Sequence, residues 1–390
     1  MTEKHRLRVR TVTFGATLSD LHQVDRIERN IAGLKRARER FNAGGYEVQT
    51  LRIAIAPLID RMSPAQRDAA LLALKRIDAL LIEHGVIMSL GPIGSPDGDD
   101  PSLTAWTTHL VRETQSISFS VVVASPERGV QQHGSRTSAQ IMLALAQALP
   151  GGLANFRFAA AANIPAGTPF FPVAWHNGPD SLAIGLEAAG LVEEAWSGEP
   201  EPNRAESELK RTFEGALQPI EAIATQIAAS ESRMFLGIDS SPAPGMDRSI
   251  GAGIEKLLGV PFGSASTLNA CAMLTAAIKS LNVKLCGYSG LMLPVLEDPV
   301  LAQRASEQRF SVRDLLLYSS VCGTGLDVVP VPASTSEATL SGLITDVAAL
   351  STRLRKPLSV RLLLVQAKEA GELATFDSPL LTSCKVMKID

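Results

Sequence analysis

Short apolar, β-branched segments alternate along the chain with longer segments of helical hydrophobic spacing. The first strands are predicted over "LRVRTVTFGA" (7–16) and "EVQTLRIAIAP" (47–57), and residues 20–43 between them have the spacing of a helix. Residues 63–85 predict a second helix, because Ser63 is a good N-cap residue and the helix can end at a glycine. The chain therefore begins with a strand–helix–strand–helix order.

The remaining 300 or so residues continue this order (about three quarters of the chain). Further strands are predicted at 86–94, 116–125, 156–164, 170–176, 234–244, 284–296, the end of 314–333, and 358–367. Further helices are predicted at 101–114, 134–149, 180–197, 203–231, 266–282, 298–308 and 336–354. About ten strands alternating with helices predict parallel strands covered by helices, as an open sheet or a closed barrel.

Composition supports one large globular fold. The 390 residues are 45 % hydrophobic and 20 % charged, so a large core can be buried. The net charge of −3 and the lack of a basic stripe give no expectation of a nucleic-acid partner. Four scattered cysteines, an N-terminus without an apolar signal sequence and the lack of a long apolar stretch predict a cytoplasmic protein with no membrane span.

Polar side chains follow several predicted strands where each strand ends. "FFPVAW" ends in His176, "MFLGI" in Asp239, and "GLMLPVL" in Glu297 and Asp298, while "VCGTGLD" carries Cys322 and Asp327. In parallel α/β folds, ligands bind at the carboxyl ends of strands. We therefore expect a polar pocket there.

A set of motifs from about residue 150 to 335 resembles a known family. The motifs are "PAGTPFFPVAWH", "SLAIGLEAAGLV", "GIDSSPAP", "GYSGLMLPVLED", "LAQRASEQR" and "LLLYSSVCGTGLDVVPVP", with weaker matches in "RVRTVTFG" and "QTLRIAIAP". Together they resemble the family catalogued as domain of unknown function 711. The resemblance implies an α/β fold similar to the ten-stranded β/α barrel of pyruvate formate-lyase and the ribonucleotide reductase large subunit, with helices outside. We expect a single domain over 1–390, with a helical excursion around 197–232.

The resemblance brings no settled activity, so function is argued from the site. The barrel relatives suggest thiyl-radical chemistry at Cys322, but the chain has no Arg-Val-x-Gly loop near its end, and a small buried cysteine is the simpler interpretation. Cys322 stays a catalytic candidate as a two-electron nucleophile or a ligand that lines the pocket. Asp239 is the strongest catalytic candidate, although it could organise its own loop as an Asx-turn. His176 could act as a base or be a packed histidine.

The other candidates also carry two interpretations. Glu297 could act in catalysis or pair with an arginine, and Asp298 before Pro299 fits a helix N-cap. Asp239, Glu297 and Asp327 could together hold a hard divalent ion such as Mg²⁺ or Mn²⁺, although Asp327 could equally cap its own turn. Four residues are predicted to bind substrate, the arginines alternatively forming buried ion pairs: Ser240, Ser289, Arg10 and Arg52.

The sequence thus favours an enzyme that acts on a small, anionic metabolite by two-electron acid–base chemistry, with or without a metal. A lyase, an isomerase and a hydrolase all fit. The competing class is a non-catalytic metabolite-binding or regulatory protein. No nicotinamide or flavin motif is present. The glycine-rich segment "LGPIGSPDG" fits neither the Walker nor the Rossmann spacing of a phosphate-binding loop. A homo-oligomer is expected on general grounds.

Overall fold

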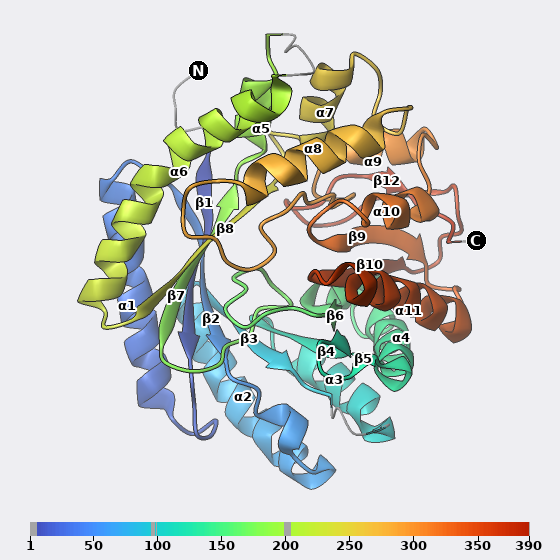
Figure 1. Cartoon of the computed structure of the whole chain (residues 1–390). Helices are drawn as coiled ribbons and strands as arrows, with labels where there is room; N and C mark the ends of the chain where they lie inside the picture. Colours follow the sequence, from blue (N-terminus) through green and yellow to red (C-terminus); the bar gives the residue numbers. More distant parts are fainter. Residues whose placement is uncertain (1–5, 95–97, 99, 199–203, 390) are drawn as a thin grey trace.

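The computed structural model describes residues 6–94, 98, 100–198 and 204–389. Its strands and helices alternate, as the sequence predicts, and helices flank a large mixed sheet (Figure 1). The strands are β1 (Arg8–Ala16), β2 (Val48–Ile55), β3 (Val86–Pro92), β4 (Ile117–Ser125), β5 (Gly129–Val130), β6 (Phe158–Ala162), β7 (Ser181–Glu187), β8 (Met234–Ala243), β9 (Gly325–Pro332), β10 (Leu358–Val365), β11 (Leu373–Ala374) and β12 (Cys384–Lys385).

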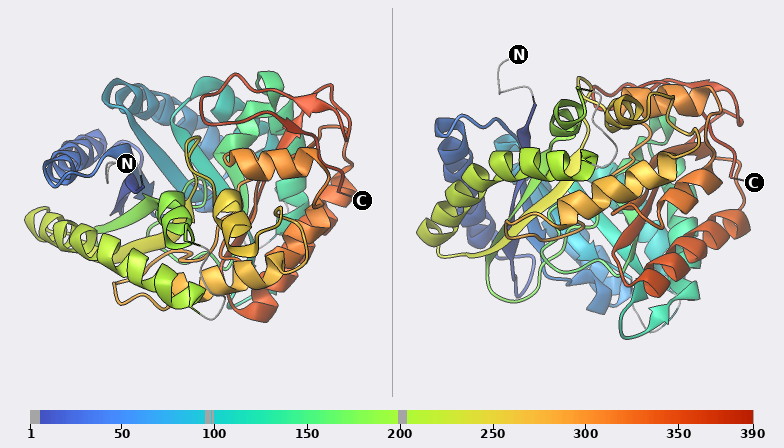
Figure 2. Two further views of the ribbon diagram at one scale, coloured as in Figure 1. Left: turned by 90° about the horizontal axis from the view of Figure 1, so that it is seen from above. Right: turned by 45° about the horizontal axis from the view of Figure 1, so that its top comes forward.

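The helices lie around the outside of the sheet in all three ribbon views (Figures 1 and 2). They are α1 (Val24–Ala43), α2 (Pro64–His84), α3 (Pro101–Glu113), α4 (Gln132–Ala146), α5 (Ala189–Ala195), α6 (Ala205–Ser230), α7 (Ile250–Leu258), α8 (Thr267–Lys279), α9 (Pro299–Ser306), α10 (Val312–Tyr318) and α11 (Glu337–Leu354), with 3-10 turns at Ile59–Arg61 and Pro150–Arg157. Among the described residues, no helix is long and apolar enough to cross a membrane.

The large sheet has ten strands, which agrees with the predicted count. Nine follow the order β8-β7-β1-β2-β3-β4-β6-β10-β9, and β5 pairs with β4. The prediction of an all-parallel arrangement is wrong, because β7 pairs antiparallel with β1 and β10 pairs antiparallel with β6. The sheet is therefore two groups of parallel strands that run in opposite directions.

Two predicted elements are wrong. Residues 170–176, predicted as a strand, form a turn and irregular backbone, because Pro169 and Pro172 lack the N–H groups that a sheet ladder needs. The helix predicted over 180–197 begins instead as strand β7, followed by α5. All seven residues of β7 are buried, so its sequence shows no alternation that would separate a strand from a helix.

The strand predicted at 284–296 is reduced to isolated bridges between the two ends of the strand order. Leu285 bridges Ile238 of β8, and Pro294 bridges Asp327 of β9. Gly287 (φ 63°) and Ser289 (φ 40°) take left-handed backbone conformations, which interrupt any regular strand. We call residues 284–297 the connecting segment.

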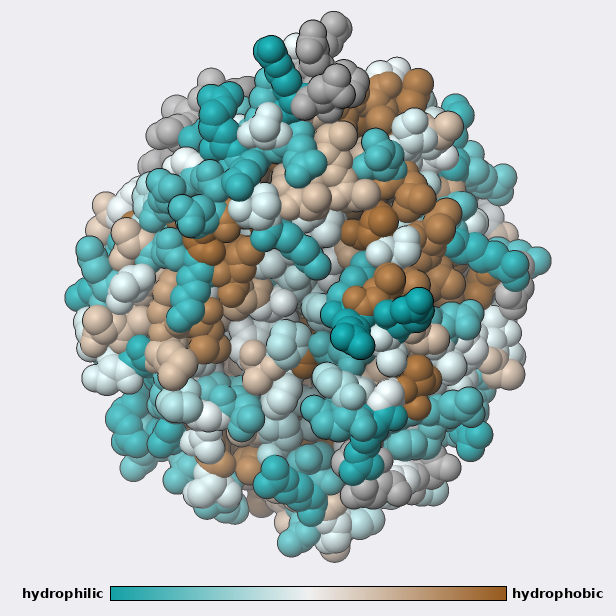
Figure 3. Space-filling model, viewed as in Figure 1, coloured by the Kyte–Doolittle hydropathy of each residue, from teal (hydrophilic) through white to brown (hydrophobic). Residues whose placement is uncertain are grey.

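Most buried hydrophobic side chains of strands and helices belong to one core cluster. A second, smaller cluster is formed by Ala159, Ala161, Phe170, Val173, Ala243, Tyr288 and Met292. On the surface, Figure 3 shows hydrophobic side chains in brown where α7, α9 and α10 lie and also left of the centre of this face, with polar side chains between them. The small cluster matters here because it forms one wall of the cavity described next.

Candidate active site

A cavity of about 780 Å³ lies where the two strand groups meet. The first group supplies residues from the beginning or middle of its strands, including Arg10 of β1 and Arg52 of β2. The second group supplies the ends of β7 and β8, at Glu187 and Ala243, and early residues of β9 and β10, at Asp327 and Arg361. Glu297, at the end of the connecting segment, also lines the cavity, so carboxyl ends come only from β7 and β8.

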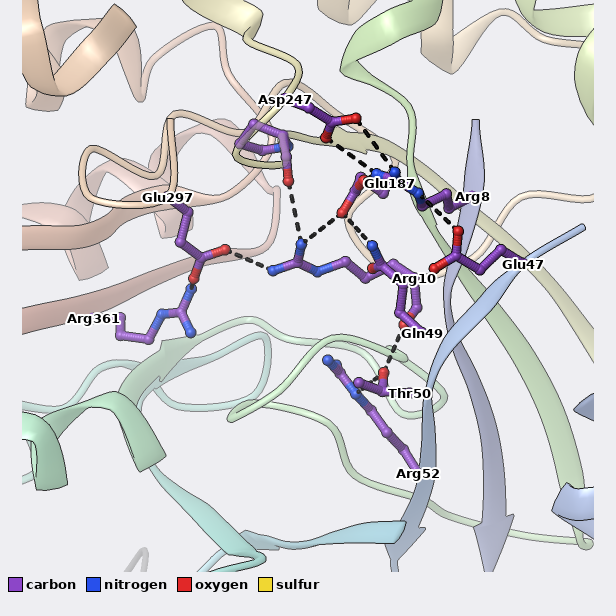
Figure 4. A network of polar contacts seen from close by, with 11 residues as sticks. Arg8, Arg10, Glu47, Gln49, Thr50, Arg52, Glu187, Asp247, Glu297 and Arg361 are labelled. Atoms are coloured by element: carbon purple, nitrogen blue, oxygen red, sulfur yellow. Dashed lines mark hydrogen bonds and ion pairs between the residues drawn. The ribbon is translucent and has the colours of Figure 1, made fainter. Parts of the chain in front are cut away.

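Glu297 is the centre of a buried chain of ion pairs (Figure 4). Its Oε2 lies 2.7 Å from Arg10 Nη2, and its Oε1 lies 2.9 Å from Arg361 Nη2. The Nε of Arg361 lies 2.7 Å from Asp327 Oδ1. A buried carboxylate is costly unless it is paired and hydrogen-bonded, and this chain satisfies that condition for both acids.

Glu187 extends this network toward the edge of the cavity. It accepts hydrogen bonds from Arg8 (2.6 Å), Arg10 (3.2 Å) and the Gln49 amide (2.7 Å). Arg8 also contacts the more exposed Asp247 at 3.1 Å. Each of these arginines therefore already has carboxylate partners, which hold the side chains in place (Figure 4).

Arg52 differs from the other arginines in this network. Its Nε donates to Thr50 Oγ1 at 3.2 Å, its Nη1 donates to the Pro169 carbonyl at 3.3 Å, and its guanidinium carbon lies 4.7 Å from the ring centre of Phe171. Among the described residues, no carboxylate lies within ion-pair distance of it. Burial, and then repulsion by Arg10 and Arg361, lower the pKa of Arg52 to about 9.

Asp327 is the carboxyl group of the cavity best suited to carry a proton. Burial raises the pKa of Asp327, Arg361 opposes the shift, and the charge of Glu297 adds to it. A second protic group, the Tyr288 hydroxyl, donates to Ser359 Oγ at 2.9 Å, and burial raises the pKa of Tyr288. The cavity thus combines a cation without a counter-ion, a carboxyl group with a raised pKa and a buried hydroxyl chain.

Apolar side chains form one part of the wall. Phe170, Val173 and Met292 belong to the small hydrophobic cluster and line the cavity together with the Tyr288 ring. An apolar wall beside fixed polar groups that can orient a ligand is typical of a small-molecule site.

The sequence candidates fall into separate places. Arg10, Arg52, Glu297 and Asp327 meet in the cavity, whereas Asp239, Ser240, His176 and Cys322 are not among its lining residues. Asp239 and Glu297 therefore do not share one pocket.

Asp239 organises the connecting segment. Its carboxylate accepts from the backbone N–H of Tyr288 (2.8 Å), of Ser289 (2.9 Å) and of Ser241 (3.1 Å), and from the Ser241 hydroxyl at 2.6 Å. Burial raises the pKa of Asp239, and these donors counteract the shift. Ser240 Oγ donates to the Ile278 carbonyl (3.2 Å), and Ser289 Oγ donates to the Cys286 carbonyl (2.8 Å).

His176 and Cys322 are both buried away from the cavity. His176 Nδ1 lies 3.2 Å from Ser181 Oγ, at the start of β7 and therefore opposite the Glu187 end, and its Nε2 lies 2.9 Å from the Gly178 carbonyl. Burial lowers the pKa of His176. The Cys322 side chain belongs to the main hydrophobic core, and its backbone carbonyl accepts from Lys356 Nζ at 2.6 Å. Both residues are therefore packed inside the protein rather than open to the cavity.

Arg361 and Glu187 are cavity residues that the sequence reasoning missed. Arg361 interrupts the apolar run "LSVRLLLVQA", and this is the signal that singled out Arg10 and Arg52 on their strands. A search for charged residues inside apolar strands would have found it. In the described ranges, no three His, Cys, Asp or Glu side chains are grouped to hold a metal ion.

Comparison with known proteins identifies the family of this chain. A family profile described as "Uncharacterised ACR (DUF711)" matches residues 1–377. A UPF0210 protein of Pyrobaculum arsenaticum is 29 % identical over 84 % of this chain and 76 % of its own length. UPF0210 proteins of Desulfovibrio desulfuricans (28 % identical, covering 100 % of this chain and 92 % of the relative) and Bifidobacterium longum (26 %, 96 % and 89 %) are also similar. Since the profile spans nearly the whole chain, the protein belongs to the DUF711 family.

Proposed function

We propose that this protein binds a small organic anion in the cavity and transfers a proton to or from it. The observation that carries the proposal is Arg52, a buried guanidinium without a carboxylate partner that lines a cavity large enough for a metabolite. Burying an unpaired charge is expensive. A ligand carboxylate or phosphate that pairs with Arg52 would offset this cost, which is why an anion is the expected ligand.

Asp327 is the proposed acid–base group. A carboxyl group whose pKa is raised above its usual range can exchange a proton closer to neutral pH than an exposed aspartate can. The coupling through Arg361 to Glu297 provides a way to redistribute charge when Asp327 gains or loses its proton. This is two-electron chemistry, consistent with a lyase, an isomerase or a hydrolase, and assays should be run with and without Mg²⁺ and Mn²⁺.

The proposal includes a finer architecture for the sheet. We propose that the connecting segment completes a closed ten-stranded barrel between β8 and β9, with the cavity inside it. The bridges at Leu285 and Pro294 support this closure.

Proton transfer can be tested without knowing the natural substrate. The wild-type protein is incubated in D₂O with a panel of small carboxylic acids, and incorporation of deuterium at carbon is followed by proton NMR. We expect exchange with a subset of the acids, loss of exchange in Asp327→Asn, and retained binding of the same acids by that variant. Asp346→Asn, which changes an exposed aspartate on α11, is the matched control.

A non-catalytic binding protein is the second candidate, favoured because Glu297 already has two arginine partners and Asp327 one. Binding of an acid that depends on Arg52, with no chemical change of any bound acid by wild type, would establish this function instead. Absence of binding by every acid in the panel would contradict both.

A further inference from the structure

The charge and the shape of the cavity together narrow the class of ligand, an inference that rests on the proposed function above. We infer that the cavity selects a monocarboxylate with an apolar body, such as an aryl- or branched alkyl-carboxylate, over dicarboxylates, phosphates and short polar acids. Three independent features support this: the lack of a carboxylate partner at Arg52, its free hydrogen-bond donors, and the apolar wall next to it.

The charge balance allows one negative charge. Of the three guanidinium groups around Glu297, Arg10 pairs with Glu187 and Glu297, and Arg361 pairs with Glu297 and Asp327. In the described part of the chain Arg52 has no carboxylate at ion-pair distance, so its positive charge is the one in this group without a counter-ion. A monoanion neutralises it, whereas a second negative charge on the ligand would meet Glu297 and Asp327 without a compensating cation in a buried site.

The donors left on Arg52 match a carboxylate. A guanidinium has five N–H donors. The Nε donor is used by Thr50 and one Nη1 donor by the Pro169 carbonyl. In the described part of the chain, the two Nη2 donors and the second Nη1 donor have no partner. Parallel donors on both terminal nitrogens can bind the two oxygens of one carboxylate, the geometry that arginine favours.

The cavity wall next to the Arg52 guanidinium is apolar. Phe171 covers the guanidinium of Arg52, and Phe170, Val173, Met292 and the Tyr288 ring continue the surface into the cavity. A ligand of only two or three carbons would leave this surface in contact with water. An aryl or branched alkyl group would bury it, at roughly 25 cal/mol per Å² of apolar area removed from water.

Isothermal titration calorimetry of the full-length protein with four probes tests the inference. The probes are 3-phenylpropionate, propionate, succinate and inorganic phosphate. We expect 3-phenylpropionate to bind at least about tenfold more tightly than each of the other three. Arg52→Met should weaken its binding by about tenfold or more, and Arg52→Lys by less, because lysine keeps the charge but not the paired donors.

Two further variants separate the apolar wall from the receptor. Val173→Thr keeps the volume but adds a hydroxyl, and should weaken 3-phenylpropionate severalfold while leaving the weak binding of propionate unchanged. Arg36→Ala removes an exposed arginine that pairs with Glu231 and should change the affinity for neither ligand. Circular dichroism and thermal melting show whether each variant is folded. If Arg52→Met does not fold, Arg52→Lys tests the role of Arg52 in binding.

The outcomes distinguish this inference from the proposed function. If succinate or phosphate binds as tightly as 3-phenylpropionate and still depends on Arg52, the ligand class is wrong and the anion site stands. If Val173→Thr leaves 3-phenylpropionate unaffected, the apolar wall is not part of the site. If no probe binds at millimolar concentration, or if binding is unchanged in both Arg52 variants, the receptor role of Arg52 is refuted and the proposed function falls with it.

Discussion

Asp239 gives the sharpest separation between a catalytic and a structural carboxylate in this fold. It is fully buried, and its two oxygens accept four hydrogen bonds, three of them from backbone N–H groups. Two of those N–H groups belong to Tyr288 and Ser289 in the connecting segment, where Ser289 has a left-handed backbone conformation. We therefore expect Asp239 to stabilise that segment rather than to act on a ligand directly.

The expected loss of unfolding free energy follows from the hydrogen bonds that Asp239 accepts. In Asp239→Asn, an amide NH₂ group facing the Tyr288 N–H would replace Oδ2, so one charge-assisted bond is lost and two donors oppose each other. This costs about 1–3 kcal/mol of unfolding free energy. In Asp239→Ala, three buried N–H groups lose their acceptor at about 1–3 kcal/mol each, offset in part because no carboxylate has to be desolvated. We expect a net loss of about 3–5 kcal/mol.

Urea unfolding and local hydrogen exchange measure the global and the local effect. The urea midpoint should be lowest for Asp239→Ala, intermediate for Asp239→Asn and highest for the wild type. Asp346→Asn should leave the midpoint unchanged. Amide exchange in a peptide that covers 284–292 should accelerate more than exchange in the strands of the first group. An Asp239→Asn protein with wild-type stability and wild-type protection of 284–292, but without turnover, would refute this reasoning and restore the catalytic interpretation.

Three other variants test packing, pH dependence and charge. Gly290→Ala places a Cβ against the Cα of Gly323, and we expect the urea midpoint to show a loss of about 1–3 kcal/mol, with no loss if the two backbones can separate. Burial lowers the pKa of His176, so below about pH 6.5 the unfolded chain binds more protons than the folded protein, and stability falls as the pH drops. His176→Gln should reduce this dependence of stability on pH by up to about 1.4 kcal/mol per pH unit. Urea titrations at several pH values measure it. Arg361→Met leaves the carboxyl groups of Glu297 and Asp327 without their shared cation, which raises the pKa of Asp327 further. The variant should therefore lose about 3–5 kcal/mol at pH 8 and less at pH 5; an equal loss at both pH values would contradict the ion-pair chain.

Much of the element order was predictable because local chemistry determines it. Ser63 accepts from the Gln66 N–H, and Gly85 ends α2 in a left-handed conformation (φ 61°), as the sequence indicated. Strands β1 and β2 lie within the predicted segments. These features depend on residues close together in sequence, so a single sequence is enough to find them.

The site was less predictable because it depends on the directions of distant strands. The rule that ligands bind at the carboxyl ends applies to parallel strands, and β–α alternation indicated such a sheet. Strand β7 instead enters antiparallel to β1, so that Arg8 lies opposite Glu187 in the register. Residues near the beginning of β1 are thereby brought to the end of β7, and nothing local in "SLAIGLE" indicates that reversal.

The adjacent acids Glu297 and Asp298 show how neighbouring residues take opposite roles when the backbone that holds them is not helical. Glu297 points into the cavity and binds two arginines. Asp298 has an extended backbone (φ −123°, ψ 112°) and accepts from N–H groups at the beginnings of two helices, Val300 and Leu301 of α9 and Ile250 of α7. One residue therefore fixes the helices behind the site while the other fixes the arginines within it. The precision of the anion site depends on both, because a shift of α9 would move Glu297, and Glu297 positions the two arginines that surround the free charge of Arg52.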